Sequence, residues 1–152
     1  MHRRKANRTP AGEAVFEIIV ATAQAFFRLR AAGTRAGAVT PWGGGTWGLL
    51  RSLKSEGPQT VPQIARARPV ARQRIQRLAN EMAEAGLVEF IDNPAHRRSR
   101  LVRLTPKGEA VFEELTERIA GLSERLAEDM KVTDLRATAA VLKRLSEKLE
   151  HV

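Results

Sequence analysis

Apolar positions recur three and four residues apart along most of the chain, and this spacing is typical of amphipathic helices. The first such segment follows Thr9, whose hydroxyl is suited to cap a helix, and it ends at Gly33. Pro10 fits the first helical position, because a backbone N–H would have no partner there. The apolar side of the segment is formed by Val15, Ile18, Thr22, Ala25, Phe26 and Leu29. A long N-terminal helix is therefore predicted.

Shorter helical patterns fill the middle of the chain. A helix is expected from about Thr46, after three consecutive glycines that would each cost a helix roughly 1 kcal/mol relative to alanine. Thr60 and Gln63 have the spacing of a capping box at the start of the next helix. A third helix is predicted at 70–85, and Gly86 suits the left-handed residue that follows many helices.

Two β-rich segments come next, LVEFID at 87–92 and SRLVRLT at 99–105. The residues between them include Asn93 and Pro94, which favour a turn, so the pair predicts a hairpin with a longer loop. The order of elements is then helix, turn, helix and hairpin. With helices on both sides, the expected fold class is mainly α with a small β-hairpin.

The C-terminal part of the chain repeats apolar side chains in nearly heptad spacing and predicts two helices, with Thr105 and Thr133 as their caps. The first begins with TPKGEAVFE at 105–113, which agrees at eight of nine positions with TPAGEAVFE at 9–17. Both segments combine a Thr cap, a Pro in the first position and a Glu near the positive helix end. This shared chemistry explains the match, which is too short to indicate a duplicated domain.

Composition limits the classes of protein to consider. The 152 residues suffice for one domain with extensions, and 43% of them are hydrophobic, enough for a packed core. The chain has no cysteine, which excludes disulfides and thiolate metal sites. His2, His96 and His151 lie far apart in sequence, so neither a metal nor a cofactor is expected. No apolar run reaches the roughly 20 residues that span a bilayer, and we expect a cytoplasmic protein.

The formal net charge of +9 favours a polyanionic partner such as nucleic acid. This charge is unevenly distributed, because residues 1–60 and 61–110 carry +6 and +5, whereas residues 111–152 carry −2. The start MHRRKANR is basic but has no adjoining aromatic face, so it is a weak membrane anchor and is expected to be a flexible arm. The basic middle of the chain is the expected binding region.

The helix predicted at 70–85 has an unusual polar side. A wheel of about 100° per residue, set with Ile75 inward, defines that side. Its outward residues are Arg72, Gln73, Arg74, Gln76, Arg77 and Asn80. Arginine pairs with guanine, and Gln or Asn with adenine, in the major groove, whereas the Lys and Glu common on solvated surfaces are missing from 70–80. A DNA-reading face is the favoured interpretation, and a merely solvated face is the alternative.

The hairpin is also basic, since Arg97, Arg98, Arg100 and Arg103 stand within seven positions. Beside a DNA-reading helix, its loop would lie over the adjacent backbone. There Arg97, Arg98 or Arg100 would neutralise phosphates or enter a narrow minor groove, and His96 is a further candidate phosphate contact. The alternative is an edge strand that charge protects from aggregation.

The stretch TVPQIARARPVARQRIQRLANEMAEAGLVEFIDNPAHRRSRLVRLTPKGEAVF, bracketed by long helices, resembles the MarR-type winged helix-turn-helix transcriptional regulators. AGLVEF and NPAHRRSRLVRLTPKG are its most specific pieces, and the match extends from about residue 40 to 112. The resemblance implies a flexible basic arm at 1–8, an N-terminal dimerisation helix at 9–36 and a winged DNA-binding domain at 40–104. Residues 105–152 would form C-terminal dimerisation helices.

The resemblance further implies a homodimeric repressor that binds a pseudo-palindromic operator in double-stranded DNA. The apolar stripes of the terminal helices support the dimer independently, because these helices have little else to bury against. A small lipophilic or aromatic effector that releases the DNA is also implied, with a cleft in the region of Phe26, Phe27, Trp42 and Trp47. Core packing is the commoner role of aromatic residues on such helix stripes.

Carried over position by position, the family's recognition-helix residues fall on Arg72, Gln73, Arg74, Gln76 and Arg77, and its wing residues on Arg97 and Arg98. Three departures stand out. His96 replaces the usual Asp before the wing arginines, and the glycines at 43–45 are atypical. Pro69 and Ala71 replace the usual Gly and helix cap, so the recognition helix is expected to start one or two residues early, with Pro69 in its first position.

A second hypothesis is a non-specific or architectural protein that uses the same basic fold for backbone contacts only. It would lose affinity steeply with salt and show no preferred sequence. An enzyme is not expected, because no nucleophile is paired with a base and WGGGTW lacks the Lys and Ser/Thr of a phosphate-binding loop.

Overall fold

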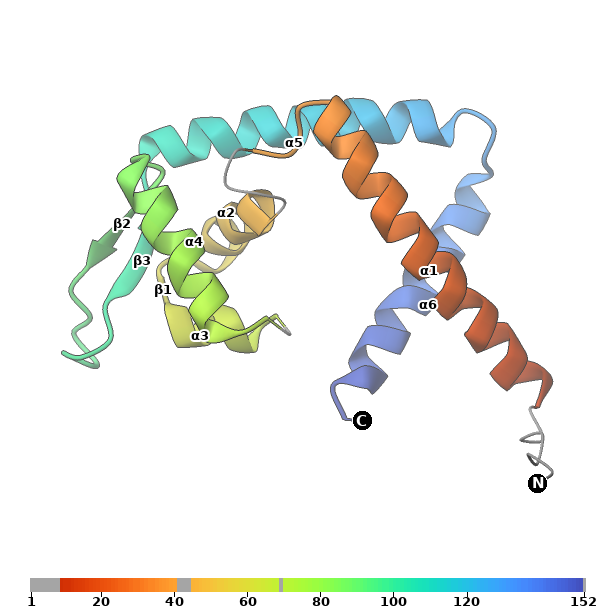
Figure 1. Cartoon of the computed structure of the whole chain (residues 1–152), viewed down its shortest axis with the longest axis horizontal. Helices are drawn as coiled ribbons and strands as arrows, with labels where there is room; N and C mark the ends of the chain where they lie inside the picture. Colours follow the sequence, from red (N-terminus) through yellow and green to blue (C-terminus); the bar gives the residue numbers. More distant parts are fainter. Residues whose placement is uncertain (1–8, 41–44, 69, 152) are drawn as a thin grey trace, which may run out of the picture.

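A computed structural model describes residues 9–40, 45–68 and 70–151 of the chain (Figure 1). It is mostly helical, with three short strands in one antiparallel sheet, so the expected fold class is confirmed. In chain order the elements are α1 (Pro10–Arg35), α2 (Gly45–Glu56), β1 (Gln59–Thr60), α3 (Val61–Arg66), α4 (Arg72–Glu84), β2 (Val88–Ile91), β3 (Leu101–Leu104), α5 (Pro106–Ala127) and α6 (Val132–Leu149).

One half of the molecule is a winged unit, which consists of α2, α3, α4, the three strands and the N-terminal half of α5. These elements pack against one another. In Figure 1, α5 runs along the top from this unit to the opposite side, where α1 and α6 project away from it. We call α1 and α6 the terminal helices. The long helix α5 is therefore the connection between the two halves.

The hydrophobic core lies within the winged unit and draws on most of its elements. Leu49 of α2, Ile64 of α3, Met82 of α4 and Val102 of β3 are fully buried. Leu115 of α5 joins this cluster and is 5% exposed. Burial of one such side chain contributes about 1.5–3 kcal/mol, so these contacts hold the unit together.

The sheet has the strand order β1-β3-β2. β2 and β3 form the expected hairpin, in which Val88 lies opposite Leu104 and Phe90 opposite Val102. On its other side β3 pairs with β1, where Gln59 lies opposite Val102. The sequence does not indicate β1, because two residues are too few to show an alternating pattern. β3 is consequently the central strand.

Three expected threonine caps are present. Thr9 and Thr105 each accept a hydrogen bond from the backbone N–H three residues later, at 3.1 and 3.0 Å. Thr60 forms the predicted capping box with Gln63, whose side chain accepts from the Thr60 N–H at 2.8 Å. These bonds satisfy N–H groups that have no partner within the helix, and they set the starts of α1, α5 and α3.

Two boundaries of the terminal helices differ from the prediction. α1 continues past Gly33 to Arg35, because the left-handed turn falls at Gly37, with φ of 68°. α6 begins after Lys131, whose carbonyl already accepts from the N–H groups of residues 134 and 135. The predicted end at Gly33 and the predicted cap at Thr133 are therefore wrong. At the start of α6 no local signal marks Lys131, which is not a preferred cap and makes no side-chain cap hydrogen bond.

The terminal helices differ from the winged unit, because their large apolar side chains are exposed in the single chain. On α1 these side chains are Val15, Phe16, Ile19, Val20, Phe26, Phe27 and Leu29. The end of α5, the turn after it and α6 expose Leu126, Met130, Val132, Val141, Leu142 and Leu149. Among the described residues, no helix combines the length and apolar character that a membrane span requires.

Candidate nucleic-acid interface

α4 places its apolar and polar residues on opposite sides, as the sequence predicts. Ile75, Ala79 and Met82 are buried against the core. The other side is exposed except for half-buried Gln76, and it carries Arg72, Gln73, Arg74, Gln76, Arg77 and Asn80. The side-chain amide of Gln76 donates a hydrogen bond to Asn80 Oδ1 at 3.0 Å. The predicted rotational setting of the helix is confirmed.

The start of α4 lies later than predicted. Its first residue is Arg72, and Ala71 is an N-cap without a side-chain hydrogen bond. The Ala71 carbonyl accepts from the N–H groups of Arg74 and Ile75 at 2.9 and 3.2 Å, which fixes the first turn there. The expected start at residue 70 or earlier is therefore wrong. Pro69, the predicted first residue, lies outside the described residues.

A groove of about 330 Å³ lies between α4 and the hairpin. Its polar lining joins Arg72, Gln76 and Asn80 of α4 with Arg98, Ser99 and Arg100 of the segment before β3. Val61 and Pro62 of α3 and Phe90 of β2 complete the described lining, which contains no acidic side chain. The structure thus brings together two groups of residues that the sequence separately associates with DNA.

A second, shallower concavity follows the outer side of α4. It is lined by Arg72, Gln73, Gln76, Arg77, Asn80, Glu81 and Glu84. The two acidic residues lie toward the C-terminal end, so the positive charge is concentrated in the N-terminal half of the helix. In helix-turn-helix proteins this half of the recognition helix contacts base edges.

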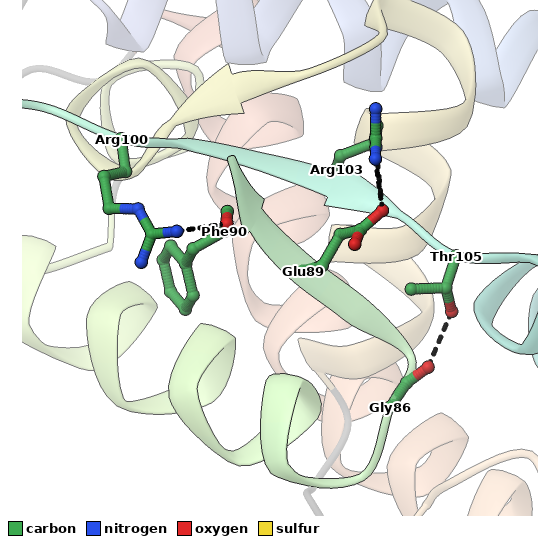
Figure 2. Close-up of polar contacts among 6 residues, drawn as sticks. All are labelled: Gly86, Glu89, Phe90, Arg100, Arg103 and Thr105. Carbon is green, nitrogen blue, oxygen red and sulfur yellow. Dashed lines mark hydrogen bonds and ion pairs between the residues drawn. The ribbon is translucent and has the colours of Figure 1, made fainter. Parts of the chain in front are cut away.

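Two arginines of the hairpin are held by its own residues. The Arg100 guanidinium donates to the Phe90 carbonyl and lies 5.8 Å from the centre of the Phe90 ring (Figure 2). Arg103 donates from Nε and Nη2 to Glu89 Oε1, at 2.9 and 2.6 Å. Arg103 therefore fastens β3 to β2, whereas Arg100 lines the groove while it is anchored to the sheet.

The loop at 92–100 is shaped by Asn93. Its Nδ2 donates to the Ser99 carbonyl at 2.9 Å, and its Oδ1 accepts from the Ala95 N–H at 3.0 Å. The three residues between Ala95 and Ser99 are exposed. These residues are the predicted contacts His96, Arg97 and Arg98, and they are therefore accessible to a partner. The edge-strand alternative is wrong, because β3 is paired on both sides.

Sequence reasoning missed Arg68, which lies in the turn between α3 and α4. Its guanidinium donates to the carbonyl of Gly48 in α2. A Cβ on Gly48 would lie 2.6 Å from Arg68 Nη1, so glycine leaves room for this contact. Burial, and then the nearby charge of Arg51, lower the pKa of Arg68 from its usual value. The contact ties the turn to α2 across 20 residues of sequence, and no local pattern could show it.

The residues suggested for an effector pocket occupy two environments. Phe26 and Phe27 are 58% and 69% exposed on α1 and touch edge to face, with ring centres 5.5 Å apart. Trp47 stacks instead on Phe112 of α5, with ring centres 6.4 Å apart, and packs against the core. Trp42 lies outside the described residues. The contacts of Trp47 are those of a packing residue.

A short helix, a turn, the polar face of α4 and a basic hairpin across a groove define the protein as a winged helix-turn-helix protein. Residues 39–99 match the model of the MarR family. An uncharacterized protein of Mycobacterium tuberculosis is 42% identical over 99 residues, which cover 65% of this chain and 68% of that protein. The uncharacterized HTH-type transcriptional regulator YdgG of Bacillus subtilis is 31% identical over 104 residues, which cover 67% and 68%.

Solved structures show the same similarity. The crystal structure of a MarR family transcription regulator superposes with a TM-score of 0.77 at 26% identity and covers 91% of this chain and 92% of that chain. A mutant MarR from E. coli in complex with operator DNA has a TM-score of 0.71 at 20% identity and covers 87% and 93%. This chain belongs to the MarR family, whose members are transcription regulators and not enzymes.

Proposed function

We propose that this protein is a homodimeric, sequence-specific repressor that binds a pseudo-palindromic site in double-stranded DNA. The observation that carries the proposal is the groove in which polar residues of α4 face Arg98 and Arg100, with no acidic residue in its described lining. A surface of this kind combines side chains that pair with bases and side chains that attract phosphates.

In this proposal the N-terminal half of α4 enters the major groove. Arg72, Arg74 and Arg77 pair with guanines, and Gln73 and Gln76 pair with adenines. Each good bidentate contact discriminates against a wrong base by about 1–3 kcal/mol, so α4 supplies most of the sequence preference.

The wing has a different task. Residues 96–98 are exposed at its tip, where Arg97 and Arg98 reach the flanking phosphates or a narrow minor groove. Such contacts add affinity for every sequence and make binding depend on salt. The wing therefore supplies affinity and register, while the anchored Arg100 keeps the wall of the groove in place.

The terminal helices support the dimer. Ile19, Phe26 and Phe27 of α1 and Leu149 of α6 are each more than half exposed in the single chain. Large exposed apolar surfaces of this kind mark protein interfaces, and obligate homodimers bury the most apolar ones. A twofold axis through these helices would present two copies of α4 to successive turns of the major groove.

Release of DNA by a small lipophilic or aromatic effector is a separate part of the proposal. Its support is the exposed aromatic pair of Phe26 and Phe27 on α1, which a second protomer would convert into the wall of a cavity. A panel of aromatic carboxylic acids, added to the preformed DNA complex, tests this part. Loss of the DNA complex of the wild type on addition of such an acid supports an effector site. If the Phe27→Ala variant loses its complex equally, the effector site does not lie at Phe26 and Phe27.

The proposed function is tested by selecting bound sequences from a random duplex pool at about 150 mM salt, which suppresses phosphate-only binding. An enriched inverted repeat supports a dimeric, sequence-reading regulator. Binding at low salt without any enriched sequence would instead indicate an architectural protein. The variant Gln73→Ala/Arg77→Ala is the control, because it alters α4 and keeps the wing. Transcription in vitro from a promoter that contains the enriched site then tests repression.

A further inference from the structure

We propose that Thr105 and Lys107, at the start of α5, are positioning residues that hold the recognition helix α4 at a fixed angle to α5. This inference rests on the proposed function, because it concerns how α4 is presented to DNA. Neither residue lines the basic groove, and both act through the backbone at the end of α4.

α4 ends in a tight left-handed turn. Gly86 has φ of 76°, and its N–H donates to the Ala83 carbonyl at 3.0 Å. The next N–H, of Leu87, donates to the Met82 carbonyl at 2.9 Å. This pair of bonds is the Schellman arrangement, which satisfies two carbonyls of the last helical turn. The carbonyls of residues 85–87, which follow the last helical residue, take part in neither of these bonds.

All three of these carbonyls accept hydrogen bonds from the start of α5. Lys107 Nζ donates to the Ala85 carbonyl at 2.7 Å. Thr105 Oγ1 donates to the Gly86 carbonyl at 2.6 Å, as Figure 2 shows. The Thr105 N–H donates to the Leu87 carbonyl at 3.1 Å. We call these five residues the clasp. Lys107 also places a positive charge at the negative end of α4, whose own last turn has no basic residue.

Gly108 permits the close approach of the two helices. A Cβ at this position would lie 2.0 Å from the Leu87 carbonyl oxygen and 2.8 Å from Leu104 Cδ1. The Thr105 hydroxyl also accepts from the Gly108 N–H at 3.0 Å while it donates to Gly86. One oxygen atom thus both caps α5 and ties it to α4, so the two helix ends behave as one rigid joint.

α5 carries this joint toward the terminal helices. Farther along it, Thr116 accepts a hydrogen bond from Trp47 of α2 at 3.0 Å, and Arg118 donates to the carbonyl of Gly37 after α1 at 2.9 Å. The end of α4 is therefore tied to α5, and α5 is tied in turn to α2 and to the turn after α1. In a dimer, the separation of the two recognition helices depends on both clasps.

The chain contains a matched control in TPAGEAVFE at 9–17. It starts α1 with the same threonine cap, but Ala11 stands where α5 has Lys107. Among the described residues, a Cβ on Gly12 would have only Thr9 Oγ1 within 4 Å, at 3.3 Å. This helix start therefore has the cap without the clasp. Thr9→Val and Thr105→Val remove equivalent caps, and Thr105→Val additionally removes the bond to Gly86.

The experiment selects bound duplexes from a random pool, using the full-length protein and the variants Lys107→Met, Thr105→Val, Thr105→Ser and Thr9→Val. The readout is the distribution of separations between the two enriched half-sites. The wild type should show one dominant separation. In Lys107→Met and Thr105→Val, the enrichment of this separation over slightly shorter or longer separations should fall by about fivefold per lost hydrogen bond. The base preference within each half-site should stay the same, because the side chains of α4 are unchanged.

Thr105→Ser keeps the hydroxyl and should restore the wild-type separation, and Thr9→Val should retain it. A purely structural role would lower the melting temperature in Thr105→Val and Thr9→Val alike and leave the separation unchanged.

Unchanged separations in Lys107→Met, with an inverted repeat selected by the wild type, would overturn the positioning role and leave the proposed function standing. Lys107 is exposed, so this variant decides the question even if Thr105→Val does not fold. No enriched repeat for the wild type would overturn the proposed function and this inference together.

The absence of cysteine allows a second readout that needs no DNA. A spin label at Gln73→Cys reports the distance between the two recognition helices of a dimer. The distance distribution should broaden when Lys107→Met is added and stay narrow when Thr9→Val is added. Equal widths in the two backgrounds would contradict the inference, whereas an absence of any label–label distance would contradict the dimer.

Discussion

The winged unit and the terminal helices use their apolar residues in opposite ways. Every buried hydrophobic side chain among the described residues lies between Leu49 and Leu115. The large exposed ones lie either up to Leu29 or from Leu126 onward. Both regions nevertheless have the same helical periodicity in sequence. Periodicity thus identifies the apolar side of a helix, but it does not reveal which chain covers that side.

Two near-identical segments make this difference concrete. In TPKGEAVFE, Val111 and Phe112 are half-buried and pack against the core. In TPAGEAVFE, Val15 and Phe16 are 37% and 49% exposed. The local chemistry starts a helix in both places, because the same cap operates. The surroundings differ because one copy packs against the core of the winged unit, whereas the other copy lies on α1, outside that unit.

The largest effect is expected where the apolar side of a terminal helix receives a charge. Leu142→Asp in α6 should convert a dimer into monomers, because each protomer loses about 1.5–3 kcal/mol of burial and gains a desolvated charge. Sedimentation velocity measures the change. Ala140→Asp, on the opposite side of the same helix, is the control and should leave the dimer intact. An unchanged dimer in Leu142→Asp would show that α6 is not part of the interface.

A smaller effect is expected at the two related glycines. Gly108→Ala should lower the free energy of unfolding by about 3 kcal/mol, because its Cβ would collide with a backbone carbonyl that cannot move freely. Gly12→Ala should change it by less than about 1 kcal/mol, since among the described residues the added methyl meets only the cap of its own helix. Urea unfolding of both variants tests the comparison, and similar losses in the two would contradict it.

Within the winged unit, α4 and the wing should respond differently. Arg77→Ala should cost about 2 kcal/mol at one base position, if it reads a guanine, and relax the preference there. Arg98→Ala should weaken binding to all sequences alike and reduce the slope of affinity against salt by about 1. Fluorescence anisotropy with base-substituted duplexes measures both. Arg103→Ala is the wing control, because Arg103 is paired with Glu89, and it should bind as the wild type does.

The smallest effect is expected at the exposed ion pair between α2 and α5. The hydrogen bond and charge of Glu109 raise the pKa of Lys54 above 10.5. A raised pKa in the folded state means that the pair stabilises the fold below pH 10.5, and that this stabilisation is lost as the pH rises through the folded pKa. Urea unfolding should show this loss in the wild type and not in Glu109→Gln. Glu89→Gln is the control, because Arg103, the partner of Glu89, keeps its proton in the pH range in which Lys54 loses its own.

Much of the local structure could be predicted from sequence, because short-range chemistry decides it. The capping box at Thr60, the inward setting of Ile75 and the left-handed turn at Gly86 all depend on neighbours within a few residues. One error arose where two local choices compete. Gly33 and Gly37 both suit the end of α1, and the packing of the chain that follows decides between them.

The candidate site was only partly predictable for the same reason. Its residue types and the face of α4 could be recognised from the sequence. The groove that joins α4 to Arg98, however, depends on how the hairpin folds back toward the helix. Arg68 and Arg100 gave no signal of their roles, since both bind backbone carbonyls, and any residue can provide a carbonyl.

By itself the sequence determined the order of the helices and of the hairpin, the basic face of α4 and the apolar sides of the terminal helices. Periodicity, capping and charge are local properties, and they persist wherever a segment lies. The tertiary structure alone decided that β3 is the central strand, that Arg103 pairs within the hairpin and that Thr105 and Lys107 clasp the end of α4. These contacts join residues that are distant in the chain, and only packing of the core brings them together.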